Sequence, residues 1–109
     1  MNRINNRVQL IGRVMYLNIN NFIDEIKSVS FHLATTVSKL DKHGKSNTTE
    51  ISHLCIAFGM HANMMEKLTS EGSKIAIQGV LISTLSAFKK EDYPTAYVQV
   101  EELLLLNSK

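Results

Sequence analysis

The sequence predicts a small all-β domain with one helix, folded as a five-stranded barrel. Several short segments alternate apolar and polar residues with the period of two that a half-buried strand requires. One later segment has helical spacing instead, and polar stretches that contain glycine separate the segments. The chain has 109 residues, of which 44% are apolar and 20% are charged, so we expect one globular domain over residues 1–109.

The first strand is predicted over residues 7–14, where apolar residues recur at every second position. Gly12 interrupts this pattern and predicts a bulge or a sharp bend. The next residues, 17–27, include three asparagines. They favour a turn or an irregular strand around Phe22.

The second strand is predicted over residues 29–38, and its alternation places Phe31 and Leu33 in the core. A polar loop with three lysines is expected over residues 38–48. The third strand, residues 51–58, is apolar on both faces in its second half. This doubling indicates burial on both sides, or a face used for binding or self-association.

The single helix is predicted over residues 60–70, where Met64, Met65 and Leu68 share one face. Gly72 is expected to end this helix as its C-terminal cap.

The rest of the chain returns to strands. Residues 75–81 are predicted as the fourth strand and residues 83–92 as a hairpin. The fifth strand covers residues 95–106 and starts after Pro94, where a missing N–H is tolerated. Three strands, one helix and two strands is the order of the Greek-key OB-fold barrel, which binds oligonucleotides on one face and in two hairpin loops.

Four short strings resemble the bacterial single-stranded DNA-binding protein family, in the right order and over most of the chain. They correspond to the family's first strand, second strand, third strand with the turn into the helix, and helix exit with the fourth strand: Asn6–Val14, Phe31–Thr35, Thr49–His53 with Ala57–Gly59, and Glu71–Gly79. The resemblance implies an OB-fold that assembles into homodimers or homotetramers. It also implies that the protein coats single-stranded DNA without sequence preference in DNA replication, recombination or repair.

A related protein is a second possibility. Family members often carry a linker rich in glycine and proline and an acidic tail, whereas this sequence ends at Lys109 with neither. A short, tail-less chain also resembles the primosomal replication protein related to the family. That resemblance implies a dimeric OB-fold that binds single-stranded DNA and a helicase.

The sequence departs from the family at the positions that stack bases, because family members use tryptophans there and this chain has none. The residues that align with the tryptophans of the third strand, the loop and the hairpin are Ser52, Lys39 or Leu40, and Ser86. Leu54 stands where an arginine is frequent. Phe58 is the one stacking position that is clearly kept.

Single strands are held by cations that track the phosphates and by flat side chains that stack with bases. Eight of the twelve cations lie near the first strand or in the two long loops that flank the binding face of an OB-fold. The predicted DNA-binding residues are these eight cations and three aromatic residues: Arg3, Arg7, Arg13, Lys39, Lys42, Lys45, Lys89, Lys90, Phe58, Phe88 and Tyr93. For any one lysine an ordinary solvated position is the alternative, whereas the set favours phosphate binding.

The aromatic residues leave alternatives open. Phe58 shares a strand face with Ser52, so it is a stacking candidate, with an ordinary core position as the alternative. Phe88 and Tyr93 lie beside the two hairpin lysines, where they either contact nucleic acid or pack on a neighbouring subunit. Phe22 is expected in the core or in an interface.

Neither enzyme chemistry nor a metal or cofactor is predicted. The four histidines lack metal-ligand spacing, and no phosphate-binding loop or nucleophile elbow occurs. Cys55, the only cysteine, is interpreted as a small buried hydrophobe. Residues 1–14 have no apolar signal segment, and the longest apolar run, residues 54–58, is too short to span a bilayer. We therefore expect a cytoplasmic, nucleoid-associated protein.

The net charge of +2 permits a polyanionic partner without requiring one. The leading hypothesis is a homo-oligomer that binds single-stranded DNA by phosphate contacts and aromatic stacking. The alternative is a primosome-type adaptor whose main partner is a replication protein, with weak or no DNA binding. The absent tryptophans and the apolar run at residues 80–82 favour this alternative. The apolar run at residues 103–106 either offers an oligomer surface or closes the barrel.

Overall fold

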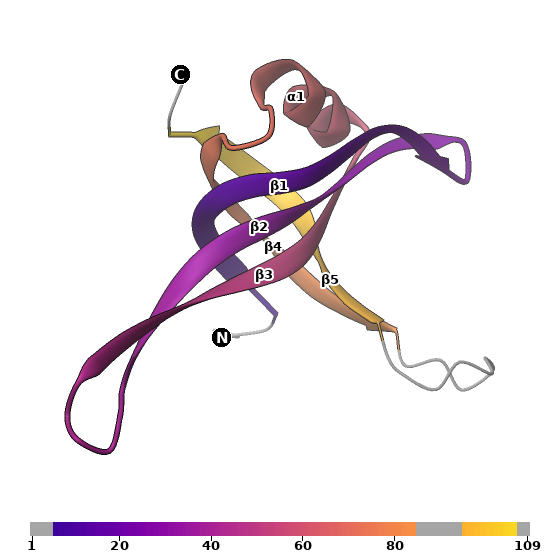
Figure 1. Cartoon of the computed structure of the whole chain (residues 1–109). Coiled ribbons are helices and arrows are strands. Elements are labelled where there is room, and N and C mark those ends of the chain that lie inside the picture. The colour runs from indigo at the N-terminus through magenta and orange to yellow at the C-terminus, as the bar shows by residue number, and fades with distance from the viewer. Residues whose placement is uncertain (1–5, 85–94, 107–109) are drawn as a thin grey trace, which may run out of the picture.

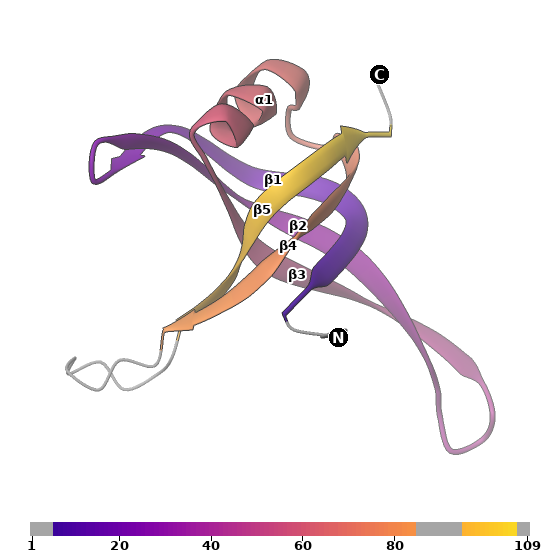
Figure 2. The ribbon, with the colours of Figure 1, turned by 180° about the vertical axis from the view of Figure 1, so that it is seen from behind.

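A computed structural model describes residues 6–84 and 95–106. The elements follow in the order β1 (Val8–Ile23), β2 (Ile26–Leu40), β3 (Ser46–Phe58), α1 (Met60–Leu68), β4 (Lys74–Thr84) and β5 (Thr95–Leu105). The strands form a closed barrel in the order β1-β2-β3-β5-β4, and α1 covers one end of it (Figures 1 and 2). The predicted element order and the OB-fold barrel are confirmed.

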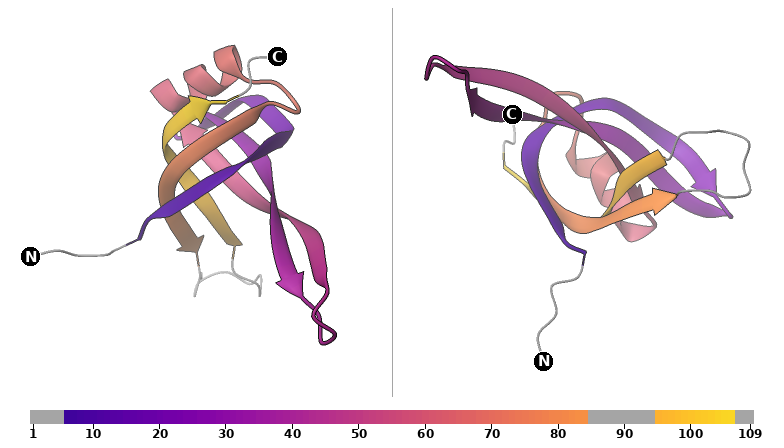
Figure 3. Two further views of the ribbon diagram at one scale, coloured as in Figure 1. Left: turned by 90° about the vertical axis from the view of Figure 1, so that its left-hand side faces the viewer. Right: turned by 90° about the horizontal axis from the view of Figure 1, so that it is seen from below.

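The barrel closes between β3 and β5. These two strands pair in parallel at only two positions, Cys55 with Val98 and Ile56 with Gln99. The other neighbouring strands all pair in an antiparallel manner. The sheet is thus closed by only a short pairing. The long hairpin of β2 and β3 extends beyond the barrel (Figure 3).

Strand β1 curves around the barrel and pairs with two neighbours in turn (Figure 3). Residues 8–13 pair with β4, and residues 13–23 pair with β2. Gly12 lies at this handover, and a Cβ built on it would be only 2.2 Å from the carbonyl oxygen of Ala34. Of the two alternatives predicted at Gly12, the bulge is wrong, since β1 pairs there without a register shift, and the bend agrees with the curvature of β1. Glycine is needed because two backbones approach closely.

Residues 17–27, which the sequence left ambiguous, form the β1–β2 hairpin turn and the strand ends beside it. They continue β1, with register shifts between Met15 and Asn18 and between Asn18 and Asn21. A two-residue turn follows, in which both Asp24 and Glu25 have positive φ values of 52° and 68°. This left-handed turn matches the twist of the flanking strands, which is why such turns close hairpins.

The β2–β3 hairpin is longer than predicted. The expected loop over residues 38–48 shrinks to 41–45, because Leu40 still pairs with Ser46. Within the turn, the carboxylate of Asp41 accepts hydrogen bonds from the backbone N–H groups of His43 and Lys45, both at 2.8 Å. The two strands therefore form a protruding arm (Figure 1).

Helix α1 buries Met65 as predicted, but not the rest of the predicted face. Ala62 and Met65 are buried, whereas Leu68 is 47% exposed and Met64 is only half-buried. The helix ends at Leu68, and the Thr69 hydroxyl donates a hydrogen bond of 2.6 Å to the carbonyl of Met65. The predicted capping role of Gly72 is therefore wrong.

The core lies inside the barrel and beneath α1. Phe31 and Leu33 are fully buried, as predicted, and the cluster includes residues from β1, β2, β3, α1, β4 and β5. The apolar run at residues 103–106 divides between two sides: Leu103 and Leu105 pack against the core, and Leu104 and Leu106 are exposed. Alternate residues of this run thus close the barrel and leave an apolar strip outside it.

The Cys55 thiol is buried in this core, and burial raises its pKa from 9.0 to about 12. The thiolate is the reactive form, so we predict that iodoacetamide does not alkylate the folded protein at pH 8 and does so in urea, as measured by mass spectrometry. The folded state favours the neutral thiol, so this stabilisation is complete below pH 9 and is lost as the pH rises towards 12. Rapid alkylation without denaturant would contradict the buried position.

Candidate nucleic-acid interface

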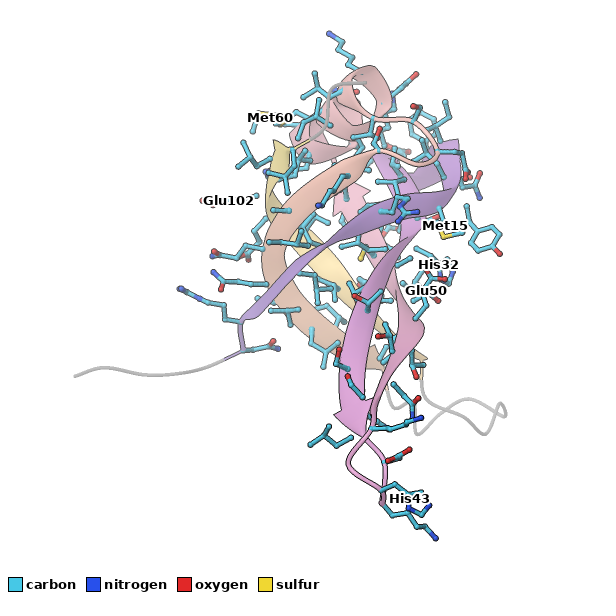
Figure 4. All side chains as sticks on the ribbon, turned by 60° about the vertical axis from the view of Figure 1, so that its left-hand side comes forward. Met15, His32, His43, Glu50, Met60 and Glu102 are labelled. Carbon is cyan, nitrogen blue, oxygen red and sulfur yellow. The ribbon has the colours of Figure 1, made fainter. Side chains whose placement is uncertain are left out.

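Strands β1, β2 and β3 present one continuous surface away from the core, which we call the outer face. Strand alternation and the register define its members: Arg13, Met15, Ser30, His32, Ala34, Glu50, Ser52, Leu54, Ile56 and Phe58. Figure 4 shows the side chains of Met15, His32 and Glu50 together on one side of the barrel, with Glu102 on the other. The outer face is therefore a surface of the barrel wall and not part of its interior.

A row of side chains crosses four strands at one end of the outer face. Arg13 pairs with Lys74 of β4 on one side and with Ala34 of β2 on the other, and Ala34 pairs with Ser52 of β3. Directly opposite side chains in a sheet lie about 5 Å apart, so the two cations are neighbours. Within the described part of the chain the only ion pair joins Lys27 and Glu66, which leaves Arg13 and Lys74 available to an anion. Lys74 was not among the predicted residues.

The centre of the outer face is apolar and low. His32 pairs with Met15 on one side and with Leu54 on the other. Beside them, Ser52 is small and exposed, whereas Ala34 is only 7% exposed and is covered by its neighbours. Ser52 stands where the family resemblance expects a tryptophan, so the face has an open floor at that point.

Phe58 lies at the far end of the same face. It has the same strand parity as Ser52 and Leu54, as predicted, and it is half-buried. It does not belong to the core cluster, whose β3 members are Cys55 and Ala57. Its position on the outer face therefore favours the stacking interpretation over an ordinary core position.

The three lysines of the β2–β3 hairpin are exposed at its outer end. Lys39 has the strand parity of Thr35 and Val37, so it lies on the opposite side of the hairpin from Thr36 and Glu50. Lys42 lies in the turn and Lys45 at its end. Lys42 and Lys45 therefore lie at the tip of the hairpin arm, beyond the residues of the outer face.

The two hairpins carry opposite charge. They extend from opposite ends of the β1–β2–β3 surface (Figure 1). The β1–β2 turn consists of Asp24 and Glu25, whereas the β2–β3 turn region carries Lys42 and Lys45. A polyanion on the outer face is therefore repelled at one end and attracted at the other.

The remaining predicted residues are Arg7 and five that lie outside the described ranges. Arg7 is six residues before Arg13, at most about 20 Å away along the strand, and it precedes the segment paired with β4. Five predicted residues lie outside the described ranges: Arg3, Phe88, Lys89, Lys90 and Tyr93. The predicted hairpin over residues 83–92 falls largely outside them as well.

Two aromatic residues of β1 are exposed. Phe22 is 66% exposed near the acidic turn, which excludes the core position and leaves the expected interface position a prediction. Tyr16 is also exposed, and its ring meets the ring of His32 edge to face, with centroids 5.5 Å apart and an interplanar angle of 85°. Neither Tyr16 nor His32 was predicted as a site residue. Strict alternation from the buried Val14 would place Tyr16 on the core side, and only the register shift after Met15 exposes it.

An apolar groove of about 610 Å³ lies over β1, β4 and β5, on the side of the barrel that carries Glu102 (Figure 4). Ile11 and Leu104 line it and are 59% and 62% exposed. Polar side chains of Gln9 and Gln78 border the groove and hydrogen-bond to each other at 3.2 Å. Among the described residues, the lining of this second surface includes Glu102 and no lysine or arginine.

Two other kinds of site were sought within the described ranges. No group of three or more His, Cys, Asp or Glu side chains is arranged to hold a metal ion there. No helix in those ranges is long and apolar enough to cross a membrane.

Comparison with known proteins adds a family and a fold. The sequence model of the Single-strand binding protein family matches residues 5–102. No curated protein matches the sequence. The structure resembles an SSB of Plasmodium falciparum in complex with ssDNA, with a TM-score of 0.80, 20% identity, and coverage of 98% of this chain and 100% of that one.

Two further solved structures are similar. The wild-type single-stranded DNA binding protein from Thermus aquaticus has a TM-score of 0.78 and 21% identity over 95% of this chain, which spans only 51% of that protein. The protein priB from Ralstonia solanacearum has a TM-score of 0.69 and 14% identity, covering 94% of this chain and 100% of that one. At these identities the likeness shows the fold alone.

Proposed function

Because the chain belongs to the Single-strand binding protein family, we propose that it binds single-stranded DNA on the outer face, without sequence preference. The observation that carries this proposal is the row in which Lys74 and Arg13 stand on the same outer face as Ser52, whose small exposed side chain leaves the floor open at that point. Cations that no described carboxylate neutralises can bind phosphates, and a low apolar floor can receive bases. The two parts of a single-strand site thus lie side by side.

The proposed mechanism divides the DNA between two kinds of contact. Arg13 and Lys74 bind phosphates and release their counterions, which makes the affinity depend on salt. Bases lie on the apolar floor and stack against Phe58, and stacking tolerates any base because every base has a π-face. Phe58 pairs with Ser28, at the end of the face nearer the acidic turn, so the DNA strand runs from Phe58 across the floor towards Lys42 and Lys45 at the other end.

Binding of a labelled oligo-dT, followed by fluorescence anisotropy at low and moderate salt, tests the proposal. A duplex of the same length is the control. The label belongs on the DNA, since the chain has no tryptophan to quench. Tight, salt-dependent binding to the single strand with little binding to the duplex is expected. Absence of binding at low salt, where electrostatic attachment is strongest, would overturn the proposal.

Replacing Phe58 by alanine is expected to weaken binding to oligo-dT about 5- to 100-fold, because one stacked base contributes about 1–3 kcal/mol. The variant Phe58→Leu separates stacking from packing, since it keeps apolar volume and removes the π-face. Both variants are compared with the parent protein by anisotropy and by thermal melting. A leucine variant that binds like the parent would assign Phe58 to packing alone.

The role in replication, recombination or repair, and the cytoplasmic location, stay predictions of this proposal. So does the homodimer or homotetramer. The groove beside Ile11 and Leu104 is the described apolar surface that a second copy can cover. Sedimentation of the purified chain checks this, and a monomer at micromolar concentration would contradict the coating model.

The same groove supports the second candidate function, an adaptor whose main partner is a replication protein. It lies away from the outer face and has no basic residue in its lining, so it suits a protein surface better than DNA. The OB-fold that the chain shares with priB is compatible with either function. Recovery of a replication protein in a pull-down, with no oligo-dT bound by the purified chain, would favour the adaptor.

A further inference from the structure

One residue inside a strand has a backbone conformation that L-amino acids rarely adopt. Among the described residues other than glycine, positive φ occurs at Asp24, Glu25 and Tyr16. The first two form the β1–β2 turn, where such values are expected, but Tyr16 lies within β1 and has φ 54°. This conformation is unfavourable for a residue with a Cβ, so the surrounding structure must impose it.

The loop after α1 imposes it. The carboxylate of Glu71 accepts hydrogen bonds from the backbone N–H groups of Tyr16, at 3.1 Å, and Leu17, at 2.7 Å. Next to them, the N–H of Gly72 donates to the carbonyl of Val14 at 2.7 Å. Tyr16 also lies in the first register shift of β1, where three residues of β1 span two of β2. The bulge and the Glu71 carboxylate together fix the backbone at Tyr16.

This arrangement holds an aromatic ring in solvent and not in the core. Tyr16 is 68% exposed, so burial of its ring does not account for the strained backbone. Its described ring partner is His32, at the centre of the outer face, and the Nδ1 atom of His32 lies 3.5 Å from the Ser52 hydroxyl. In an edge-to-face pair at least one face of each ring stays free of the other ring. A flat ligand can therefore stack on this pair.

We propose that Tyr16 is a base-stacking residue of this chain and that Glu71 positions it. The proposal rests on the single-strand binding proposed above and assigns a contact within that site. Tyr16 reaches the outer face from β1, beside the floor that Ser52 leaves open on β3. The ring that β3 lacks at Ser52 is thus supplied by β1, from the other side of β2.

The variant Tyr16→Gly tests the stacking role, because glycine accepts the positive φ and removes only the side chain. Affinity for oligo-dT is expected to fall about 5- to 100-fold, the range for one stacked base, while the melting temperature is retained. The slope of affinity against salt is expected to stay the same, since no phosphate contact is lost. Tyr16→Phe, which keeps the ring, is expected to restore the affinity.

A matched control is available on the same strand. Phe22 is 66% exposed, almost the same as Tyr16, but lies near the acidic turn, so Phe22→Ala is expected to bind like the parent protein. If the parent binds oligo-dT and Tyr16→Gly binds equally well, the inference fails while the proposed function stands. If the parent itself does not bind, both fail.

The positioning role of Glu71 has its own readout. Glu71→Ala is expected to lower the affinity by a factor similar to that of Tyr16→Gly. In the double variant Glu71→Ala with Tyr16→Gly, the affinity is expected to fall no further than in Tyr16→Gly alone, because both changes remove the same contact. A merely structural role for Glu71 predicts independent losses that multiply, and that result would overturn the positioning role.

Discussion

Replacing Gly12 by alanine is expected to destabilise the protein by about 3 kcal/mol or more, the upper range for overpacking at a close backbone contact. The new Cβ would lie 2.2 Å from the carbonyl oxygen of Ala34 and 3.0 Å from its carbonyl carbon. Neither atom belongs to a flexible side chain, so β1 and β2 would have to separate where β1 changes partner. Urea denaturation followed by far-UV circular dichroism measures the loss.

A second glycine variant and a surface control test the same explanation. Gly79→Ala is expected to behave in the same way, since its Cβ would lie 2.0 Å from the carbonyl oxygen of Gln99. Ser38→Ala, at an exposed position of β2, is expected to change the stability by no more than about 0.5 kcal/mol, as at most surface sites. A Gly12→Ala variant as stable as the Ser38 variant would show that the two strands are not in close contact.

The element order and the core could be predicted because alternation is strong where one face of a strand is buried. Phe31 and Leu33 are examples. The arm of the β2–β3 hairpin could not be predicted, since residues 38–40 and 46–50 are exposed on both faces and have no alternation to read. Backbone pairing alone extends those strands. The family resemblance seen in the sequence is confirmed by the match over residues 5–102.

The predictions were wrong at positions whose structure depends on contacts with distant parts of the chain. The sequence pattern marks Gly12 as unusual, but the reason that glycine is needed there, the nearby carbonyl of Ala34, lies on another strand. The buried face of α1 depends on how the helix docks on the barrel end, which favours Ala62 over the larger Leu68. Apolar character alone could not distinguish these positions.

The candidate site was predictable in part for the same reason. Strand parity correctly places Phe58 on the face of Ser52. Lys74 was missed because its nearness to Arg13 depends on the register between β1 and β4, which are sixty residues apart in sequence. Tyr16 was missed because a bulge and a distant carboxylate set its backbone. Neither cause leaves a local pattern in the sequence.

The double variant Arg13→Ala with Lys74→Ala is expected to lower the slope of log affinity against log salt concentration by about 1.4, because each phosphate contact on a single strand contributes about 0.7. The loss of affinity is therefore largest at low salt and shrinks as salt is added. Oligo-dT binding measured over a series of sodium chloride concentrations gives this slope directly. Both side chains are exposed at the surface, so the fold is expected to survive the change.

The controls for this variant test position as well as charge. Lys67→Ala removes an exposed cation from the last turn of α1, away from the outer face, and is expected to leave the slope unchanged. Glu50→Gln removes a negative charge from the outer face itself, so it is expected to raise the affinity at low salt. If the Arg13 and Lys74 double variant has the same slope as the parent and as Lys67→Ala, the phosphates do not lie along the Lys74–Arg13 row. In that case a lower slope in the variant Lys42→Ala with Lys45→Ala would place the phosphates on the hairpin arm, and only bases would contact the outer face.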